Sequence, residues 1–156
     1  MNFFLGVGGG FLLAVLWMDL MFDVLVFSRA GERRSAASDV LADDVLAGIA
    51  SYYRRVTTTA SPMNHLVGAV MAAMVVILVS KLAASGGTRV VDGISLALCG
   101  VPITLALVRI FPSAIRLGTR KDPPSEQSRL AREICRAHLV CFVAMTAFVV
   151  LRWNAG

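Results

Sequence analysis

The sequence predicts an all-α protein, a four-helix transmembrane bundle with an additional amphipathic helix at the cytoplasmic interface. The chain has 156 residues, of which 57% are hydrophobic and 16% are charged. A soluble domain of this size would carry roughly 25% charged residues. The apolar residues are gathered into four blocks, each long enough to cross a bilayer as a helix. The connections between the blocks are short, so residues 1–156 are expected to form a single membrane domain.

The first predicted span covers about residues 3–27 and begins with a glycine-rich stretch. Gly6 and Gly10 are four positions apart, which is the spacing that lets a second helix approach closely in a membrane. We therefore expect this face to be a candidate contact in a homo- or hetero-oligomer.

An amphipathic helix is predicted at about residues 38–56. Acidic residues come early in this segment and arginines come late, which matches the helix dipole. Its apolar stripe consists of Leu41, Val45, Ile49, Tyr52 and Val56. We expect this helix to lie along the cytoplasmic surface of the bilayer. The alternative is a lid over a pocket that faces the cytoplasm.

The remaining spans are predicted at about residues 62–84, 91–118 and 128–153. Pro102 and Pro112 fall inside the third span, and each removes a backbone donor, so kinks are expected there. The three cysteines, Cys99, Cys135 and Cys141, lie in or beside apolar segments and are expected to be buried, unpaired side chains.

Basic residues indicate the topology, because loops rich in Lys and Arg stay on the cytoplasmic side. Most of them fall in the connections after the first and third spans, namely Arg29, Arg33, Arg34, Arg54, Arg55, Arg116, Arg120, Lys121, Arg129, Arg132 and Arg136. We expect an integral protein of the plasma (inner) membrane with both termini outside. Since the arginines sit beside the spans, the net charge of +5 does not indicate a nucleic-acid partner.

Two carboxylates, Asp19 and Asp23, lie within the first apolar block. A charged group at bilayer depth costs about 2.5–3.5 kcal/mol on insertion scales, so each acid needs a partner, a proton or a task. The two residues are four apart and share one helix face. Counted along each helix, polar residues of the other spans fall in the same layer near the cytoplasmic side. These residues are Asn64, His65, Arg109, Arg136 and His138.

Arg109 is the predicted counter-ion of the acids, because guanidinium stays charged and binds a carboxylate through two nitrogens. His65 and His138 are expected to share the second acid or to carry protons. Three interpretations follow: an ion-pair network that fixes the helices, a pocket for a small lipophilic molecule, or a one-sided proton path. If the pocket is catalytic, Asp23 or His138 would be the base, Arg109 would stabilise an anion, and Tyr52 and Tyr53 would border the mouth.

A fourth interpretation is a non-catalytic subunit of a larger membrane assembly. The spacing of the acids, histidines and cysteines matches none of the metal or haem motifs HExxH, ExxH or CxxCH, so no metal site is expected. The sequence identifies no cofactor, and the lipid bilayer is the one partner that composition alone indicates.

The third span contains Val101-Pro102-Ile103-Thr104 and Phe111-Pro112-Ser113-Ala114-Ile115-Arg116-Leu117, and the fourth opens with Arg132-Glu133-Ile134-Cys135-Arg136-Ala137-His138. This pattern resembles the anthrone-oxygenase-like family of small four-span membrane proteins, whose third span carries P-x-T and then P-x-N-x-x-L. The resemblance covers the third and fourth spans, with Ala114 in place of the family's Asn and no Trp before His138. It implies a four-helix membrane bundle and, for characterised members, oxygenation of polycyclic anthrones without an evident metal motif.

Overall fold

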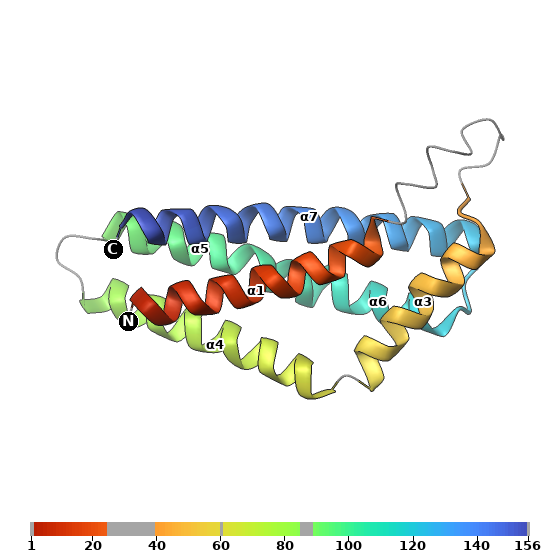
Figure 1. Cartoon of the computed structure of the whole chain (residues 1–156), viewed down its shortest axis with the longest axis horizontal. Helices are drawn as coiled ribbons and strands as arrows, with labels where there is room; N and C mark the ends of the chain where they lie inside the picture. Colours follow the sequence, from red (N-terminus) through yellow and green to blue (C-terminus); the bar gives the residue numbers. More distant parts are fainter. Residues whose placement is uncertain (1, 25–39, 60, 85–88, 156) are drawn as a thin grey trace.

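The chain folds into long apolar helices, as the computed structural model in Figure 1 shows. The structure describes residues 2–24, 40–59, 61–84 and 89–155. The elements are α1 (Asn2–Asp23), α3 (Asp43–Thr58), α4 (Ser61–Ala84), α5 (Arg89–Leu105), the π-helical turn η1 (Ala106–Ile110), α6 (Phe111–Thr119) and α7 (Pro124–Asn154). We call the end of the bundle beside α3 the α3 end, and the end where α1 begins and α7 finishes the terminal end.

Within the described residues, four stretches are long and apolar enough to cross a membrane: Asn2–Asp23, Pro62–Ala84, Val90–Thr119 and Pro124–Asn154. The predicted all-α class and the four spans are thus confirmed, and the chain fits a polytopic integral membrane protein in contact with lipid. α1 ends at Asp23, and the predicted continuation over residues 25–27 lies outside the described residues. So do Arg29, Arg33 and Arg34 of the first connection. α7 begins before the predicted residue 128.

The third span is continuous but changes its helical pitch. α5 contains Pro102, and the π-turn η1 follows it directly before Pro112 on α6. A proline ring collides with the carbonyl group four residues earlier in an α-helix, and a wider turn relieves that contact. The Phe111 amide donates to the Ala106 carbonyl across this wide turn. The sequence predicted kinks at the two prolines, and the structure has a π-turn between them.

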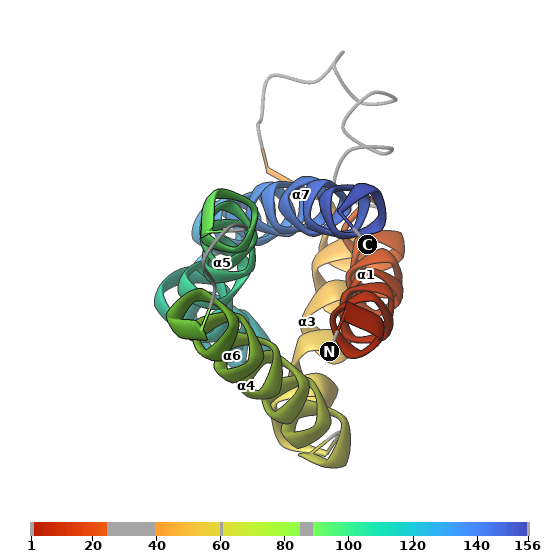
Figure 2. The same ribbon diagram turned by 90° about the vertical axis from the view of Figure 1, so that its left-hand side faces the viewer.

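Seen from the terminal end, α1, α7, α5 and α4 succeed one another around the bundle (Figure 2). Two glycines allow close contacts of α1. A Cβ atom at Gly9 would lie 2.8 Å from Val149 of α7, and one at Gly8 would lie 2.9 Å from Met74 of α4. Cβ atoms at Gly6 and Gly10 would meet nothing within 4 Å. The oligomer contact through Gly6 and Gly10 therefore stays a prediction.

α3 crosses the α3 end of the bundle and packs on α6 and the first part of α7 (Figure 1). Its apolar face, including Val45, Ile49 and Tyr53, forms a buried cluster with Leu117 of α6 and Ile134 of α7. Helices α6 and α7 cover this face, and the position of α3 at the cytoplasmic surface of the bilayer stays a prediction. The helix also begins later than predicted, at Asp43, while residues 38 and 39 lie outside the described part of the chain.

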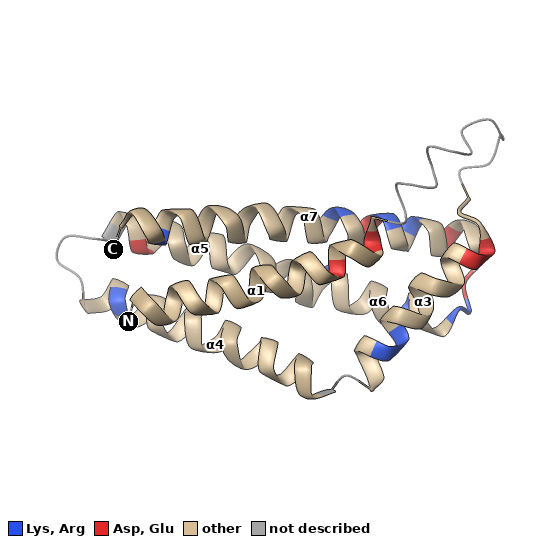
Figure 3. Cartoon of the chain, viewed as in Figure 1, with Lys and Arg blue, Asp and Glu red and all other residues tan. Residues whose placement is uncertain are grey.

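The charged residues gather at the α3 end, with a smaller group at the terminal end (Figure 3). Residues 3–18, 66–80, 93–108 and 139–151 contain no Asp, Glu, Lys, Arg or His. These segments form the apolar middle of the four spans. Each polar cluster described below lies at one border of this middle layer.

Candidate functional site

Asp23, at the end of α1, is the centre of a buried hydrogen-bonded group. Its side chain is 1% exposed, and each carboxylate oxygen has a partner. Tyr53 of α3 donates its hydroxyl to Oδ1 at 2.5 Å, and Nδ1 of His138 on α7 lies 2.5 Å from Oδ2. An ionised carboxylate only accepts hydrogen bonds, so the imidazole carries a proton on Nδ1. Three helices are joined at this one side chain.

Asp19 lies one turn earlier on the same face of α1 and is half-buried. The Tyr52 hydroxyl of α3 donates to its Oδ1 atom. Phe22 stacks on the Tyr52 ring at a centroid distance of 4.1 Å, and Tyr53 meets that ring edge-on at 5.3 Å. Two consecutive tyrosines of α3 thus bind two consecutive acids of α1, which fixes the angle at which α3 approaches.

Burial raises the pKa of Tyr52 from its usual value of 10.0, and the negative charge of Asp19 raises it further. The pKa of Tyr53 is raised in the same way by burial and by Asp23. Both hydroxyls therefore keep their protons at physiological pH and remain donors to the acids.

A cavity of about 360 Å³ adjoins this group. Asp19, Tyr52, Tyr53 and His138 line it, whereas Asp23 lies behind them and does not. The rest of the wall is mostly apolar and comes from all of the packed helices: Leu12, Val15, Leu16, Met18, Val56, Met63, Val67, Met71, Pro102, Ala106, Ile110, Phe111, Ala114, Cys141 and Met145. The volume falls within the range of pockets that hold small organic ligands. The cavity thus has one polar corner, at the α3 end, and a long apolar body.

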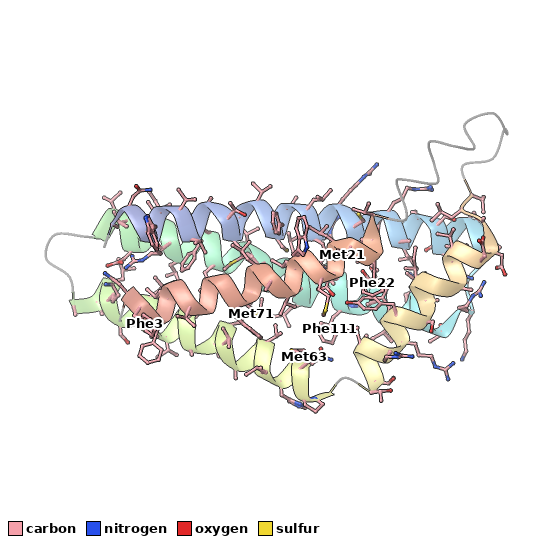
Figure 4. The ribbon with its side chains drawn as sticks, viewed as in Figure 1. Phe3, Met21, Phe22, Met63, Met71 and Phe111 are labelled. Carbon is pink, nitrogen blue, oxygen red and sulfur yellow. The ribbon has the colours of Figure 1, made fainter. Side chains whose placement is uncertain are left out.

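Exposed residues of α1 and α4 line the cavity where these two helices diverge. Figure 1 shows the two helices separating toward the α3 end, and in Figure 4 Met63 and Met71 lie on the side of α4 toward α1. Met18 of α1 and Met63 both line the cavity and are 44% and 43% exposed. At the α3 end, next to these residues, helix α3 covers the end of the bundle. A molecule dissolved in the bilayer would meet flexible thioether side chains where α1 and α4 diverge.

The predicted role of Arg109 as counter-ion was wrong. It lies in the π-turn η1 with its side chain exposed on the outer face, and in the described part of the chain no ion pair joins it to Asp19 or Asp23. Its neighbours Ala106 and Ile110 line the cavity instead. The partner of Asp23 is His138, the second candidate.

The other predicted residues divide between the cavity and the outer surface. Tyr52 and Tyr53 border the cavity as expected and, beyond the expectation, bind the two acids. Asn64 lines the cavity too, and its amide donates to the Val56 carbonyl at 2.6 Å, which ties α4 to the end of α3. His65 and Arg136 are exposed on α4 and α7 and do not line the cavity, so the prediction that they join the acids was wrong.

A second buried polar group, which the sequence reasoning did not find, lies at the terminal end. Arg152 of α7 donates from Nη1 to Asp92 of α5 at 2.7 Å and from Nη2 to Asn2 of α1 at 2.5 Å. Lys81 of α4 donates to the same Asn2 oxygen at 3.0 Å. The sequence did hold a signal for this pair. Asp92 is in the first turn of the third span and Arg152 is in the last turn of the fourth, so the two charges fall at the same end of the bundle.

The three cysteines are unpaired and buried, as predicted, and Cys141 contributes to the cavity wall. Among the described residues, no group of three or more His, Cys, Asp or Glu side chains is placed to hold a metal ion.

Comparison of the chain with protein-family models, with curated proteins and with solved structures found no match. The resemblance to the anthrone-oxygenase-like family therefore rests on the residues of the third and fourth spans and remains a prediction. Inferences about function come from the geometry of the site.

Proposed function

We propose that this membrane protein binds a small lipophilic molecule in the cavity beneath α3, with the polar end of that molecule at Asp19, Tyr52 and His138. The observation that carries the proposal is the meeting of ionisable side chains with an otherwise apolar cavity of ligand size. A purely structural network would have its polar atoms turned toward one another and away from open space. Here His138 and Asp19 are bound on one side and face the cavity on the other.

The shape of the cavity supports a ligand with an apolar body and one polar group. The apolar wall extends from the α3 end up to Leu12 and Met71, while the polar lining residues come from α3 and the nearby parts of α1, α4 and α7, namely Asp19, Tyr52, Tyr53, Arg55, Thr57, Asn64 and His138. The divergence of α1 and α4 gives such a molecule a route from the bilayer. The resemblance of the third and fourth spans to a family that acts on polycyclic compounds agrees with an apolar ligand.

A second candidate function is conversion of the bound molecule, and the Asp23–His138 pair favours it. Asp23 holds Nδ1 of His138, so the other ring nitrogen, Nε2, is left as the acceptor and makes no hydrogen bond with any described residue. A carboxylate that fixes one imidazole nitrogen and leaves the other as a base is the arrangement used in general-base catalysis. In this account His138 takes a proton from the ligand, and Asp23 positions the imidazole. Arg109 has no part in it.

Two neighbouring residues of the π-turn provide the test of binding. Ala106 lines the cavity, whereas Leu107 is 68% exposed on the outer face. In Ala106→Phe the new ring occupies cavity space, while in Leu107→Phe it adds apolar surface toward lipid. Each variant is purified in lipid nanodiscs, the co-purified small molecules are extracted, and an environment-sensitive apolar dye is titrated.

We expect Ala106→Phe to lose both the co-purified molecule and saturable dye binding, and Leu107→Phe to keep both. Gel filtration and thermal unfolding show that both variants are folded. Equal binding by the two folded variants would contradict the proposed site. For conversion, His138→Gln should retain the ligand but no longer change it during incubation, as mass spectrometry of the extract would show.

A further inference from the structure

The charges at the polar corner of the cavity do not balance. Two carboxylates, Asp19 and Asp23, face a single imidazole, that of His138. With both acids ionised, this group keeps at least one negative charge whichever protons the single imidazole carries. No Lys or Arg pairs with either acid in the part of the chain that the structure describes.

The uncompensated charge is on Asp19. Asp23 has a partner on each oxygen, but Asp19 accepts one hydrogen bond, from Tyr52 at Oδ1. Its Oδ2 atom accepts no hydrogen bond from any described residue, and Asp19 lines the cavity. A carboxylate in apolar surroundings is costly until an opposite charge or a proton reaches it.

The walls beside Asp19 suit a cation as well. Tyr52, whose ring has Phe22 stacked on one face, lines the cavity beside the acid, and Phe111 of α6 lines it too. Aromatic faces attract cations through their quadrupole. The sulfur atoms of Met18 and Met63 are soft and polarisable. Arg55 also borders the cavity, with its side chain exposed.

From this juxtaposition we propose that the ligand is a lipophilic cation, an amine or quaternary ammonium with an apolar body, whose charge is bound by Asp19 beside the Tyr52 ring. This inference rests on the proposed binding function and names the substrate class of the same site. The apolar body lies along Leu12, Val15 and Met71, and the cation takes the polar corner. The ligand enters from the lipid between α1 and α4.

Three probes with the same phenylbutyl body test the proposal: 4-phenylbutyl-trimethylammonium, its uncharged carbon isostere with a tert-butyl group, and the anion 5-phenylpentanoate, whose head group is a carboxylate. Each is titrated against wild-type protein in nanodiscs of zwitterionic lipid, and empty nanodiscs are subtracted. We expect the cation to bind at least about tenfold more tightly than the isostere, and the anion most weakly.

Asp19→Asn should remove the preference for the cation and leave the affinity for the isostere unchanged. The matched control is Asp43→Asn, which removes an acid from α3 whose side chain is 82% exposed, pairs with Arg120 and does not line the cavity. This control should keep the full preference. The comparison of cation and isostere on the wild type needs no variant, so it tests the cation proposal even if Asp19→Asn fails to fold.

Equal binding of the cation and the isostere by the wild type would overturn the cation proposal and leave the lipophilic site standing. Tighter binding of the anion would overturn it as well and would assign recognition to Arg55. If none of the three probes binds saturably, both the cation proposal and the lipophilic site fail.

Discussion

The two buried polar groups of this bundle join similar sets of helices but are built from different chemistry. At the terminal end, Arg152 and Asp92 form a closed ion pair between α7 and α5, with side-chain exposures of 4% and 1%. At the α3 end, Asp23 pairs with His138 in equal burial, but Asp19 and His138 border a cavity. At the terminal end, the buried acid Asp92 has a permanent cation, Arg152. At the α3 end, two acids, Asp19 and Asp23, share a single imidazole, that of His138.

The difference separates a structural pair from a candidate site. Guanidinium cannot lose its proton in a protein, so Arg152 and Asp92 are committed to each other. Imidazole has no such permanent charge, and His138 borders the cavity, so a ligand there can contact it. Burial and ion pairing alone do not distinguish these groups. What distinguishes them is the cavity that adjoins the α3 end and the excess of acids over cations there.

The largest expected effect separates the two groups by stability. Asp92→Asn leaves Arg152 buried with a permanent charge, which costs about 3–5 kcal/mol of unfolding free energy. Asp23→Asn costs less, because the amide oxygen can still accept from Tyr53 and an imidazole, unlike a guanidinium, is not permanently charged. Thermal unfolding in one detergent, followed by tryptophan fluorescence, measures both. Equal losses of unfolding free energy in the two variants would contradict the distinction between a structural ion pair and a candidate site.

Removing single hydroxyl groups sharpens the comparison within the α3 end. Tyr53→Phe leaves one oxygen of the buried Asp23 without its donor, and an unsatisfied buried group costs about 1–3 kcal/mol. Tyr52→Phe should cost less, since Asp19 is half-buried and can reach water or ligand through the cavity. Chemical or thermal unfolding of the two single variants ranks them. A larger loss in Tyr52→Phe would place the key contact at Asp19 instead.

The tyrosines also predict a pH dependence. Burial and the two acids raise both tyrosine pKa values above 10.0, so in this pH range the folded chain retains protons that the unfolded chain loses. The contribution is fully present below pH 10 and falls as the pH rises beyond it. The melting temperature should therefore fall more steeply above pH 10 in the wild type than in the Tyr52→Phe, Tyr53→Phe double variant. Parallel curves would show that the hydroxyls are not held by the acids.

The smallest effect is expected at Arg109. Arg109→Gln should leave ligand binding unchanged, because the side chain faces away from the cavity, and stability should change by no more than about 0.5 kcal/mol. Dye titration and unfolding of the purified variant check both values. Loss of ligand binding in Arg109→Gln would show that Arg109 contributes to the binding site.

The sequence was a good guide to what periodicity and depth determine. The shared face of Asp19 and Asp23 and the depth of His138 were readable from residue spacing, and both hold in the structure. The misplaced Arg109 was predicted from its depth and its permanent charge, without its position around the helix. Pro102, Ala106, Ile110 and Ala114 recur every four residues on the cavity side, and Arg109 falls beside that stripe.

Other features depend on tertiary placement that no spacing gives. Tyr52 and Tyr53 reach the acids because α3 docks on α6, where a Cβ atom at Gly118 would lie 3.1 Å from the Arg54 backbone. The cavity exists because α1 and α4 diverge after their contact at Gly8 and Met74. Such angles between helices come from packing, so the sequence allowed a pocket and a lid over it only as alternatives and could not place the cavity or its lining.

The central claim, that the α3 end binds a lipophilic molecule, is tested most directly by photolabelling. An apolar diazirine probe is illuminated with the protein in nanodiscs, and labelled residues are mapped by mass spectrometry with and without an excess of unlabelled probe. The account predicts competed labels on cavity residues such as Tyr52, Met63 and Met71. Labels spread over lipid-facing residues such as Val76 and Val143, with no competition anywhere, would contradict it.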